Sequence, residues 1–307
     1  MNIHADSKVA VLINGSAGGG HDDNGLAEID AQLRAAGCTA EAVLVSAQEI
    51  TSAVEKAVHE GVGTLVVGGG DGTLGLVASI LAGTDIILGI LPMGSLNHFA
   101  KDLGIPPDLP GAVRTALQGC VAHVDIGEVN GRVFINNSSI GIYPDIVRLR
   151  ERQRQRFGTG KWLAFAAATW AVLRRGARLK LRIAGADREL TRRTPFVFVG
   201  NNEYRHAGFD FGSRSSLQGG VLGVYTTRKQ GLLGILRITL KGITGRLDQG
   251  ADYDALSATE VVIETHRHRV RVANDGEVEW MTSPLRYRSR VAALQVMVPR
   301  SFHMKDG

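Results

Sequence analysis

The chain has only two cysteines, Cys38 and Cys120, in 307 residues. Two cysteines cannot build a disulfide framework or a cysteine-based metal cluster, and their spacing matches no catalytic motif, so a reducing cytoplasm is the favoured compartment. Long apolar runs are also scarce. The longest nearly apolar run, 162–173, has 12 residues between Lys161 and Arg174. Because a spanning helix needs about 20 apolar residues, the sequence predicts no membrane crossing.

Three common nucleotide-site or phosphotransfer signatures are absent. Gly160-Lys161 precedes a tryptophan, so the chain has no P-loop Gly-Lys-(Ser/Thr) sequence. The loop that begins at Asn14 lacks the Gly-x-Gly-x-x-Gly spacing of dinucleotide-binding folds. Asp210-Phe211-Gly212 spells the protein kinase metal tripeptide, but no His-Arg-Asp catalytic loop accompanies it. These absences argue against P-loop enzymes, dinucleotide-binding enzymes and protein kinases.

A glycine-rich loop is the most informative feature that is present. Residues 68–73, Gly-Gly-Gly-Asp-Gly-Thr, follow the β-like run 64–67 and precede a helical pattern that begins at about Thr73. Glycines leave no Cβ in the way, so backbone amides can converge on phosphate oxygens near the positive end of a helix. Asp71 would repel phosphate unless a cation or a proton transfer lies between them, which favours Mg-nucleotide chemistry. A tight turn with a capping aspartate is the structural alternative.

Two further loops and a late acidic turn complete the pattern. Residues 14–20, Asn-Gly-Ser-Ala-Gly-Gly-Gly, follow one predicted strand, and 91–100, which begins Leu-Pro-Met-Gly-Ser-Leu-Asn, follows another. Asp275-Gly276-Glu277 comes near the end. In these motifs and their order, the chain resembles the diacylglycerol kinase catalytic-domain family, which includes bacterial soluble lipid kinases and the sphingosine and ceramide kinases. The resemblance extends from about Val9 to about Val298.

Hydrophobic periodicity predicts two regions. The first is an α/β nucleotide-binding domain of the NAD kinase/diacylglycerol kinase type over residues 1–124, with ligand loops at the carboxyl ends of its strands. Its predicted strands are 9–13, 40–45, 64–67 and 86–90, and Ser46-x-x-Glu49 is a capping box. The second is a mainly antiparallel β domain for the lipid substrate over 125–293. Its predicted strands are 132–140, 179–183, 195–200, 221–227, 259–264 and 269–273. A further strand is predicted at 294–298, and the resemblance implies that the final strand, about 294–307, returns to the first domain.

The resemblance also implies a role for each motif. It assigns the phosphates of ATP to two loops: Asn14, Gly15, Ser16, Ala17 and Gly18, and Gly69, Gly70, Asp71, Gly72 and Thr73. Gly94, Ser95 and Asn97 would contact nucleotide or phosphate, His98 would have a minor binding role, and Asp71 would act on Mg²⁺ through water. One carboxylate of Asp275 and Glu277 would accept the proton of the lipid hydroxyl, and the other would fix geometry or metal. Which of the two is the base stays open, and Asn274-Asp275-Gly276 is also a good hairpin turn.

The chain departs from the family pattern at three positions. Many members have Asp-Asp-Gly-x-Leu-Asp, which holds a structural Mg²⁺, where residues 218–223 read Gln-Gly-Gly-Val-Leu-Gly. Since a hard dication prefers several charged oxygen ligands, the sequence gives little support for a structural metal. Leu76 stands where many relatives have Glu, a change that bears on nucleotide handling. Ser95 replaces the commoner Thr and keeps the hydroxyl.

Positive charge is concentrated in one segment. Residues 148–182 contain eleven Lys or Arg and one Glu, so this segment carries +10 and the rest of the chain −5, given a net charge of +5. Such a field suits lipid headgroups or nucleic acid. Trp162, Phe165 and Trp170 lie between its basic ends and favour an interfacial helix, with a core helix as the alternative. The segment has no RNA-binding signature, so no nucleic-acid partner is expected.

These observations predict a cytoplasmic lipid kinase that uses Mg-ATP to phosphorylate a hydroxyl of a diacylglycerol-like or related membrane lipid. It would bind an anionic membrane peripherally, at the inner face. A kinase of a soluble acceptor, as in the NAD kinases, is one alternative, although the apolar stretch 232–238 suits a lipid better. A non-catalytic lipid-binding protein with the same fold is another, supported by Leu76 and the lost acidic stretch. A homodimer is compatible with the sequence.

Overall fold

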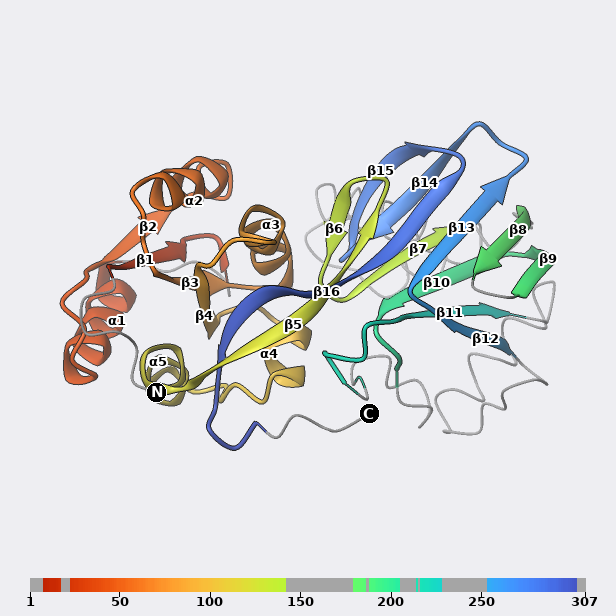
Figure 1. Ribbon diagram of the computed structural model, residues 1–307. Helices are drawn as coiled ribbons and strands as arrows, with labels where there is room; N and C mark the ends of the chain where they lie inside the picture. The colour runs from red at the N-terminus through yellow and green to blue at the C-terminus, as the bar shows by residue number, and fades with distance from the viewer. Residues whose placement is uncertain are drawn as a thin grey trace, which may run out of the picture. The chain divides into compact units, whose positions relative to one another are not determined.

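The computed structural model describes residues 8–17, 23–141, 179–185, 188–204, 214, 216–227 and 253–302. The chain divides into two compact units (Figure 1). Unit 1 comprises residues 1–126, 216–219 and 290–307, and unit 2 comprises 127–215 and 220–289. The predictions made for Gly18, for most of the basic segment 148–182 and for 232–238 lie outside the described residues.

Unit 1 is built on parallel strands in the order β2-β1-β3-β4. The strands are β1 (Val9–Asn14), β2 (Ala42–Val45), β3 (Thr64–Gly69) and β4 (Ile87–Pro92). Figure 1 shows α2 (Ile50–His59) and α3 (Asp71–Leu81) on one face of these strands, and α1 (Asp23–Ala35) and α5 (Leu109–Gln118) on the other. Helices on both faces explain why β3 is buried throughout and reads as a continuous apolar run. The predicted α/β layer is confirmed, with strand ends within two residues.

The sequence signals for helix starts were correct for one helix and two residues late for another. Ser46 and Glu49 make the reciprocal bonds of a capping box, with 3.2 Å from the Ser46 amide to Glu49 Oε2 and 3.3 Å from the Glu49 amide to Ser46 Oγ. Hydrogen bonds from the Ser46 hydroxyl, at 2.6 Å, and from the Ser46 amide hold the pKa of Glu49 below its usual value. Helix α2 begins just after the box, at Ile50. Helix α3 begins at Asp71, two residues before the predicted start.

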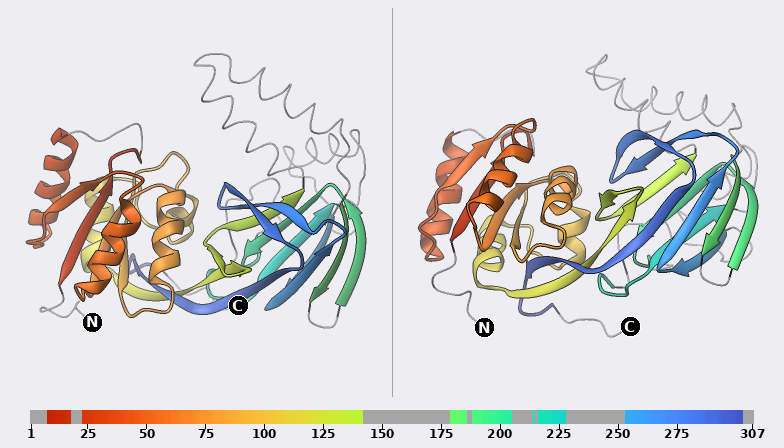
Figure 2. Two further views of the ribbon diagram at one scale, coloured as in Figure 1. Left: turned by 90° about the horizontal axis from the view of Figure 1, so that it is seen from above. Right: turned by 45° about the horizontal axis from the view of Figure 1, so that its top comes forward.

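The last strand, β16 (Leu285–Val298), serves both units and can be followed in Figure 2. Its first residues pair antiparallel with β13 (Glu260–Thr265) in unit 2, and Gln295 and Val296 pair in parallel with β4 in unit 1. Between them Ala292 has φ 51°, and its amide donates to Asp125 Oδ1 at 2.9 Å. The predicted strand at 294–298 is therefore only the end of a longer one.

Unit 2 contains a six-stranded antiparallel sheet in the order β12-β11-β10-β7-β14-β15. Its strands are β7 (Asn137–Gly141), β10 (Phe196–Asn201), β11 (Leu222–Thr227), β12 (Tyr253–Ala258), β14 (Arg269–Asn274) and β15 (Glu277–Thr282). A second group pairs β13 with β8 (Leu179–Gly185), and β8 with β9 (Arg188–Thr194), also antiparallel. The predicted mainly antiparallel β region is confirmed.

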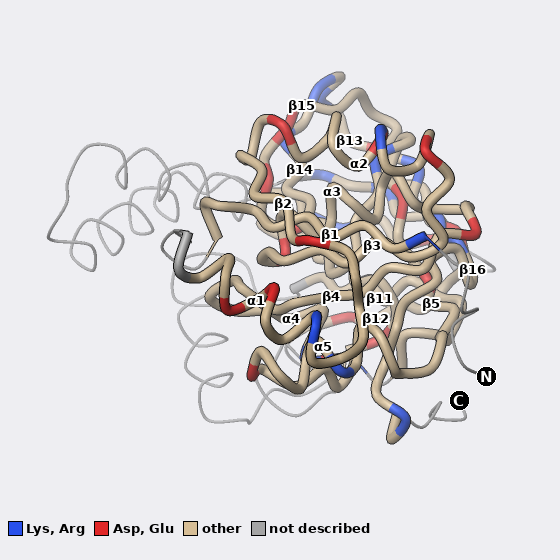
Figure 3. Tube along the Cα trace, turned by 90° about the vertical axis from the view of Figure 1, so that its left-hand side faces the viewer, with Lys and Arg blue, Asp and Glu red and all other residues tan. Residues whose placement is uncertain are grey.

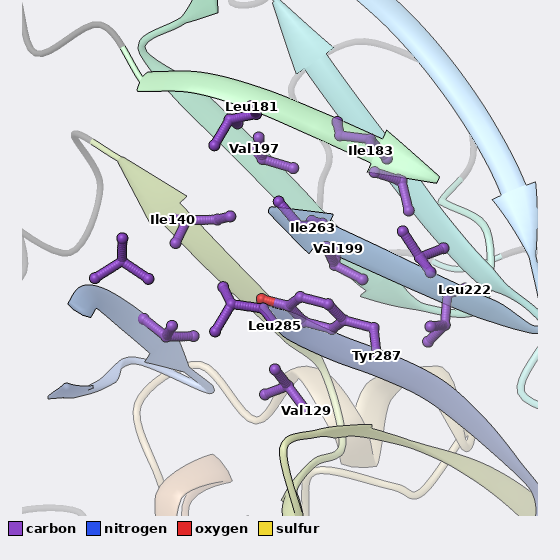
Figure 4. Close-up of a cluster of buried hydrophobic side chains, with 14 of the residues drawn as sticks. Val129, Ile140, Leu181, Ile183, Val197, Val199, Leu222, Ile263, Leu285 and Tyr287 are labelled. Atoms are coloured by element: carbon purple, nitrogen blue, oxygen red, sulfur yellow. The ribbon is translucent and has the colours of Figure 1, made fainter. Parts of the chain in front are cut away.

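The core of unit 2 lies between these two groups of strands. Figure 4 shows buried side chains from the six-stranded sheet facing those from β8, β13 and β16; the labelled ones include Ile140, Val197, Val199, Leu181, Ile263 and Tyr287. Side chains alternate along β10, so Phe198 lies on the opposite face of the sheet, in a ring cluster with Tyr204 and Tyr225. Burial raises the pKa of Tyr287, whose hydroxyl lies 3.1 Å from Ser138 Oγ.

One predicted strand is two strands in the structure. The run 132–140 is interrupted at Ile135 and Asn136, between β6 (Arg132–Phe134) and β7. The amides of these two residues bind the carboxylate of Asp275 instead of a neighbouring strand. Local periodicity cannot show such a distant partner. The sequence analysis also missed β5 (Cys120–Val129), β9, β12 and β15. Among the described helices, none combines the length and apolarity that a bilayer crossing requires.

Candidate functional site

Three loops leave the carboxyl ends of β1, β3 and β4 in unit 1. We call residues 14–17 the first loop, 68–73 the second and 92–97 the third. The first and second are joined by Asn14, whose Nδ2 donates to Thr73 Oγ1 at 2.8 Å. Asn14 Oδ1 accepts the Ser16 amide at 3.0 Å, and the Gly15 amide donates to Val45 O at 3.0 Å. Asn14 therefore fixes the first loop and its distance from α3.

Asp71 joins the second loop to the helix that follows the third. Its Oδ2 accepts the His98 amide at 3.1 Å, and its Oδ1 accepts the Phe99 amide at 3.0 Å. These amides open α4 (His98–Asp102), so Asp71 caps a neighbouring helix rather than its own. Amide donors offset the carboxylate charge, which explains how an aspartate is tolerated in this loop.

The second and third loops also meet through their backbones. The Met93 amide donates to Gly69 O at 3.0 Å. A Cβ on Gly94 would lie 2.5 Å from Gly70 Cα, and a Cβ on Gly70 would lie 3.1 Å from Gly94 Cα. These two glycines are therefore required for one loop to approach the other. From the sequence, the lack of Cβ atoms in this loop was explained by the room that a phosphate needs, and the contact between the two loops was not predicted.

Asn97 gives the third loop its shape. Its backbone is left-handed, with φ 50°, and its side chain accepts from the Gly94 amide at 2.9 Å and donates to Gly94 O at 2.8 Å. Ser95 and Leu96 form the exposed tip, where the Leu96 side chain is 56% exposed. Of the residues predicted to contact nucleotide in this loop, Asn97 is occupied in holding it closed, and Ser95 presents its hydroxyl to solvent.

The joined loops surround the amino terminus of α3. The amides of Gly72 and Thr73 donate to no group in the described part of the chain, as expected for the first turn of a helix. These donors and the partial positive charge of an 11-residue helix fit a phosphate group. The residues of unit 1 therefore suit a nucleoside phosphate, with the exposed Ser16 beside them on the first loop.

The late acidic motif belongs to unit 2, where it turns β14 into β15. Asn274 pairs with Glu277, and positive φ at Asp275 (47°) and Gly276 (92°) matches a two-residue hairpin turn. The hairpin signal was thus correct. The Asp275 carboxylate accepts three amides: Oδ2 from Ile135 at 2.8 Å, and Oδ1 from Asn136 at 2.8 Å and Asn137 at 3.0 Å.

A buried polar network holds residues 135 and 136, the residues whose amides bind the Asp275 carboxylate. Asn201 Nδ2 donates to Ile135 O at 3.0 Å, Tyr204 Oη donates to Asn136 O at 3.1 Å, and the Arg214 guanidinium donates to Asn136 Oδ1 at 3.1 Å. Burial raises the pKa of Asp275 to about 6, while the three amide bonds and the charge of Arg214 oppose the rise. The carboxylate is therefore mostly ionised at neutral pH and serves as an acceptor. No motif in the sequence pointed to Arg214 or Asn201.

Glu277 differs from Asp275 in its exposure and in its hydrogen bonding. Its side chain is exposed, and it forms no hydrogen bond or ion pair with the described residues. Asp275 has its oxygens engaged by amides, whereas Glu277, two residues later, has a carboxylate available to a ligand. The ambiguity between these two residues in the sequence thus corresponds to two different environments in the structure.

The stretch that replaces the family's acidic segment is held by neutral hydrogen bonds. Gln218 Nε2 donates to His123 O at 2.8 Å, and the Asp125 amide donates to Leu217 O at 2.8 Å. No group of three or more His, Cys, Asp or Glu side chains suited to a metal occurs among the described residues. These residues do not fit a structural Mg²⁺.

Comparison with known proteins gives a consistent result. The family model described as diacylglycerol kinase catalytic domain matches residues 8–129. A Pseudomonas aeruginosa protein described as a probable YegS-like lipid kinase is 38% identical over 136 residues, which is 44% of this chain and 44% of the relative. A diacylglycerol kinase from Staphylococcus aureus is 40% identical over 95 residues, 30% of each chain. The matches thus span less than half of these curated relatives.

Solved structures show the same fold over nearly the whole chain. A crystal structure of a diacylglycerol kinase from Bacillus anthracis superposes with a TM-score of 0.71 at 20% identity, covering 97% of this chain and 98% of that chain. Another Bacillus anthracis structure gives a TM-score of 0.76 at 22% identity, covering 97% and 99%. The fold of both regions is therefore shared with these proteins.

The poor fit of residues 218–223 to a structural metal leads to a prediction about Mg²⁺ and stability. We expect Mg²⁺ alone to leave the melting temperature of the full chain unchanged, and Mg-ATP to raise it by mass action. Thermal melts with Mg²⁺, with chelator and with Mg-ATP measure this. A large shift caused by Mg²⁺ without nucleotide would contradict it.

The contact between the second and third loops can be tested through glycine. Gly94→Ala adds a Cβ that would lie 2.5 Å from Gly70 Cα, and Gly70→Val adds one 3.1 Å from Gly94 Cα. We expect each variant to weaken Mg-ATP binding by about ten-fold or more, because the loops must separate. Ser95→Thr, at the exposed tip, is the matched control and should bind normally. Calorimetry with Mg-ATP decides, and full affinity in Gly94→Ala would refute the role of this contact.

Proposed function

We propose that this chain, whose residues 8–129 match the diacylglycerol kinase catalytic domain model, transfers the γ-phosphoryl group of Mg-ATP to a hydroxyl of a diacylglycerol-like membrane lipid. The observation that carries the proposal is the joining of three loops around the first turn of α3, where the Gly72 and Thr73 amides donate to no described group. Phosphoryl transfer depends mainly on positioning and charge stabilisation, and this arrangement provides both.

In unit 1, the proposed task is to hold the nucleotide phosphates. The amides of Gly72 and Thr73 would donate to phosphate oxygens, and the Asn14–Thr73 bond keeps the first loop in register with them. When bound, Mg²⁺ would neutralise part of the charge on the transferred group. Asp71 would orient water on that cation while its bonds to the amides of α4 keep its carboxylate in place.

In unit 2, the proposed task is to activate the acceptor. Glu277 would take the proton of the lipid hydroxyl, because its carboxylate is exposed and has no partner among the described residues. Asp275 would act as a positioning residue, since its carboxylate binds three amides and fixes the turn that carries Glu277. This division of labour extends the sequence analysis, which treated the two acids alike.

A lipid acceptor has the better support over a soluble one. The curated relatives that match the chain are described as a probable lipid kinase and as diacylglycerol kinases. The basic, tryptophan-bearing segment 148–182 also favours peripheral contact with an anionic membrane, at its inner face if the protein is cytoplasmic. A non-catalytic lipid-binding protein remains the alternative that Leu76 favours.

A phosphoryl-transfer assay tests the proposed function directly. We expect the full chain with Mg-ATP carrying a radiolabelled γ-phosphate to label a species in total lipid extract, and not to label water-soluble acceptors. ATP consumption with each acceptor is followed in parallel. Labelling of a soluble acceptor alone would favour the alternative kinase, and labelling of neither would leave only the non-catalytic alternative.

The roles of the two acids separate in kinetics and stability. Glu277→Gln should lower turnover by ~10²–10⁴-fold at an unchanged melting temperature, because it removes only a base. Asp275→Asn should lower turnover and should also lower the free energy of unfolding by about 1–3 kcal/mol, because the NH₂ group of the new side chain would face amide donors. Glu260→Gln, at another exposed glutamate of unit 2, is the control. Wild-type turnover in purified Glu277→Gln would rule out the proposed base.

A further inference from the structure

The edge of the six-stranded sheet carries an exposed tryptophan beside two arginines of the neighbouring strand. Trp280 lies on β15, the last strand of the sheet order, and is 52% exposed. The guanidinium carbon of Arg271 lies 4.7 Å from the centre of its ring, and that of Arg269 lies 5.9 Å away. We call Arg269, Arg271 and Trp280 the tryptophan patch. All three residues belong to the β14–β15 hairpin.

The register places the patch on the face of the hairpin that turns away from the core. Arg271 pairs with Trp280 and Arg269 with Thr282, so these side chains share one face. The alternate residues Val270, Val272 and Met281 are buried in the core of unit 2. Packing within the unit therefore does not require an indole at position 280. Stacking with arginine covers part of the ring but still leaves half of it in water.

Neighbouring charges make the surroundings of the indole basic. The loop from β13 to β14, His266-Arg267-His268, is exposed. Arg267 and Arg269 form no ion pair with the described residues. Two nearby acids are already paired: Glu264 of β13 with Arg182 at 3.4 Å, and Glu279 of β15 with Arg132 at 3.5 Å. Glu277, at the start of β15, is the nearby acid without a partner among the described residues. Elsewhere along the described trace, acidic and basic residues are interspersed, as Figure 3 shows.

We propose that the tryptophan patch docks the β14–β15 hairpin on the surface of an anionic phospholipid bilayer. Arginines bind lipid phosphates, and indole rings prefer the boundary between headgroups and acyl chains, so the two residue types together match this surface. The choice of a bilayer as the partner rests on the proposed function. The surface itself lies entirely within described residues and is distinct from the basic segment found in the sequence.

Docking through the tryptophan patch would also bring the hairpin tip that carries the proposed base, Glu277, near the membrane. Trp280 is three residues from Glu277 on the same strand, so the two side chains leave opposite faces of β15 near the hairpin tip. At about 3.3 Å per residue, the anchor and the proposed base are roughly 10 Å apart along β15. A lipid hydroxyl lies near the headgroup boundary, so an indole held at that boundary keeps the hairpin tip within reach of it.

Flotation on vesicles tests the docking surface without any need for turnover. The full chain is compared with two variants, which we call the patch variants. Arg267→Gln/Arg269→Gln removes one arginine of the patch and the arginine of the adjoining β13–β14 loop, and Trp280→Ala removes the indole. The vesicles contain phosphatidylglycerol and phosphatidylcholine, or phosphatidylcholine alone. Each arginine near an anionic surface contributes up to about five-fold in partition, so the double variant should lose up to about 25-fold on anionic vesicles and little on neutral ones. Trp280→Ala should lose about ten-fold on both, because the apolar contribution does not depend on lipid charge.

Matched controls keep the result interpretable. Arg34→Gln/Arg114→Gln removes the same charge from exposed helix positions of unit 1 and should float like the wild type. Trp280→Phe keeps an apolar ring and should restore much of the binding lost in Trp280→Ala, while thermal melts check folding. Patch variants should also keep their rate on a monomeric short-chain acceptor and lose it on vesicles.

The outcomes separate this inference from the proposed function. If the wild type labels no lipid but flotation still depends on the patch, the docking surface stands and the proposed activity falls. If both patch variants float on anionic vesicles like the wild type, or lose no more than the Arg34/Arg114 control, the inference is overturned.

Discussion

The arrangement of the candidate nucleotide site depends on one carboxylate. Asp71 binds the first amides of α4 and so holds the second loop against the third, across 27 and 28 residues of sequence. Hydrogen bonds to a charged group each contribute about 1.5–3 kcal/mol, and losing them would also leave two helix amides unpaired. The close approach of Gly70 and Gly94 is tolerated only because neither carries a Cβ. The shape offered to a phosphate is thus fixed before any ligand arrives, which is the condition for electrostatic preorganisation.

Unit 2 also contains an aspartate that binds backbone amides far away in the sequence. Asp275 binds the amides of residues 135–137, about 140 residues earlier in the chain, and so fixes the hairpin tip that carries Glu277. In each case a short aspartate side chain at a tight turn satisfies amides that no strand or helix can pair. An aspartate engaged in this way is a poor base. The neighbouring Glu277, which has no such partners among the described residues, is therefore the one suited to move a proton.

Local patterns were enough to predict the framework but not its connections. The buried strands of unit 1 read as apolar runs because helices cover both faces, and the glycine loops stand at their ends. By contrast, β9 is largely polar and lacks a clear alternation, and the break at Ile135-Asn136 arises from a carboxylate far away in the sequence. The motifs indicated three loops that the structure brings together, yet the contacts that shape them, Asp71 with α4 and Gly70 with Gly94, depend on tertiary structure. Nothing in a single sequence identifies Arg214 as support for Asp275.

The hairpin that holds Glu277 is at the edge of its sheet, so its stiffness cannot come from sheet pairing alone. Among the described strands, β15 pairs only with β14. The bonds of Asp275 at the tip, and those of Glu279 to Arg132 and Asn274, supply what a second neighbour would give. An exposed apolar ring on an edge strand is also a liability, because unpaired edges recruit other chains. Arginines on the same face oppose such pairing by repulsion between copies. The same charges attract an anionic bilayer, so one arrangement disfavours self-association and favours the partner inferred for this surface.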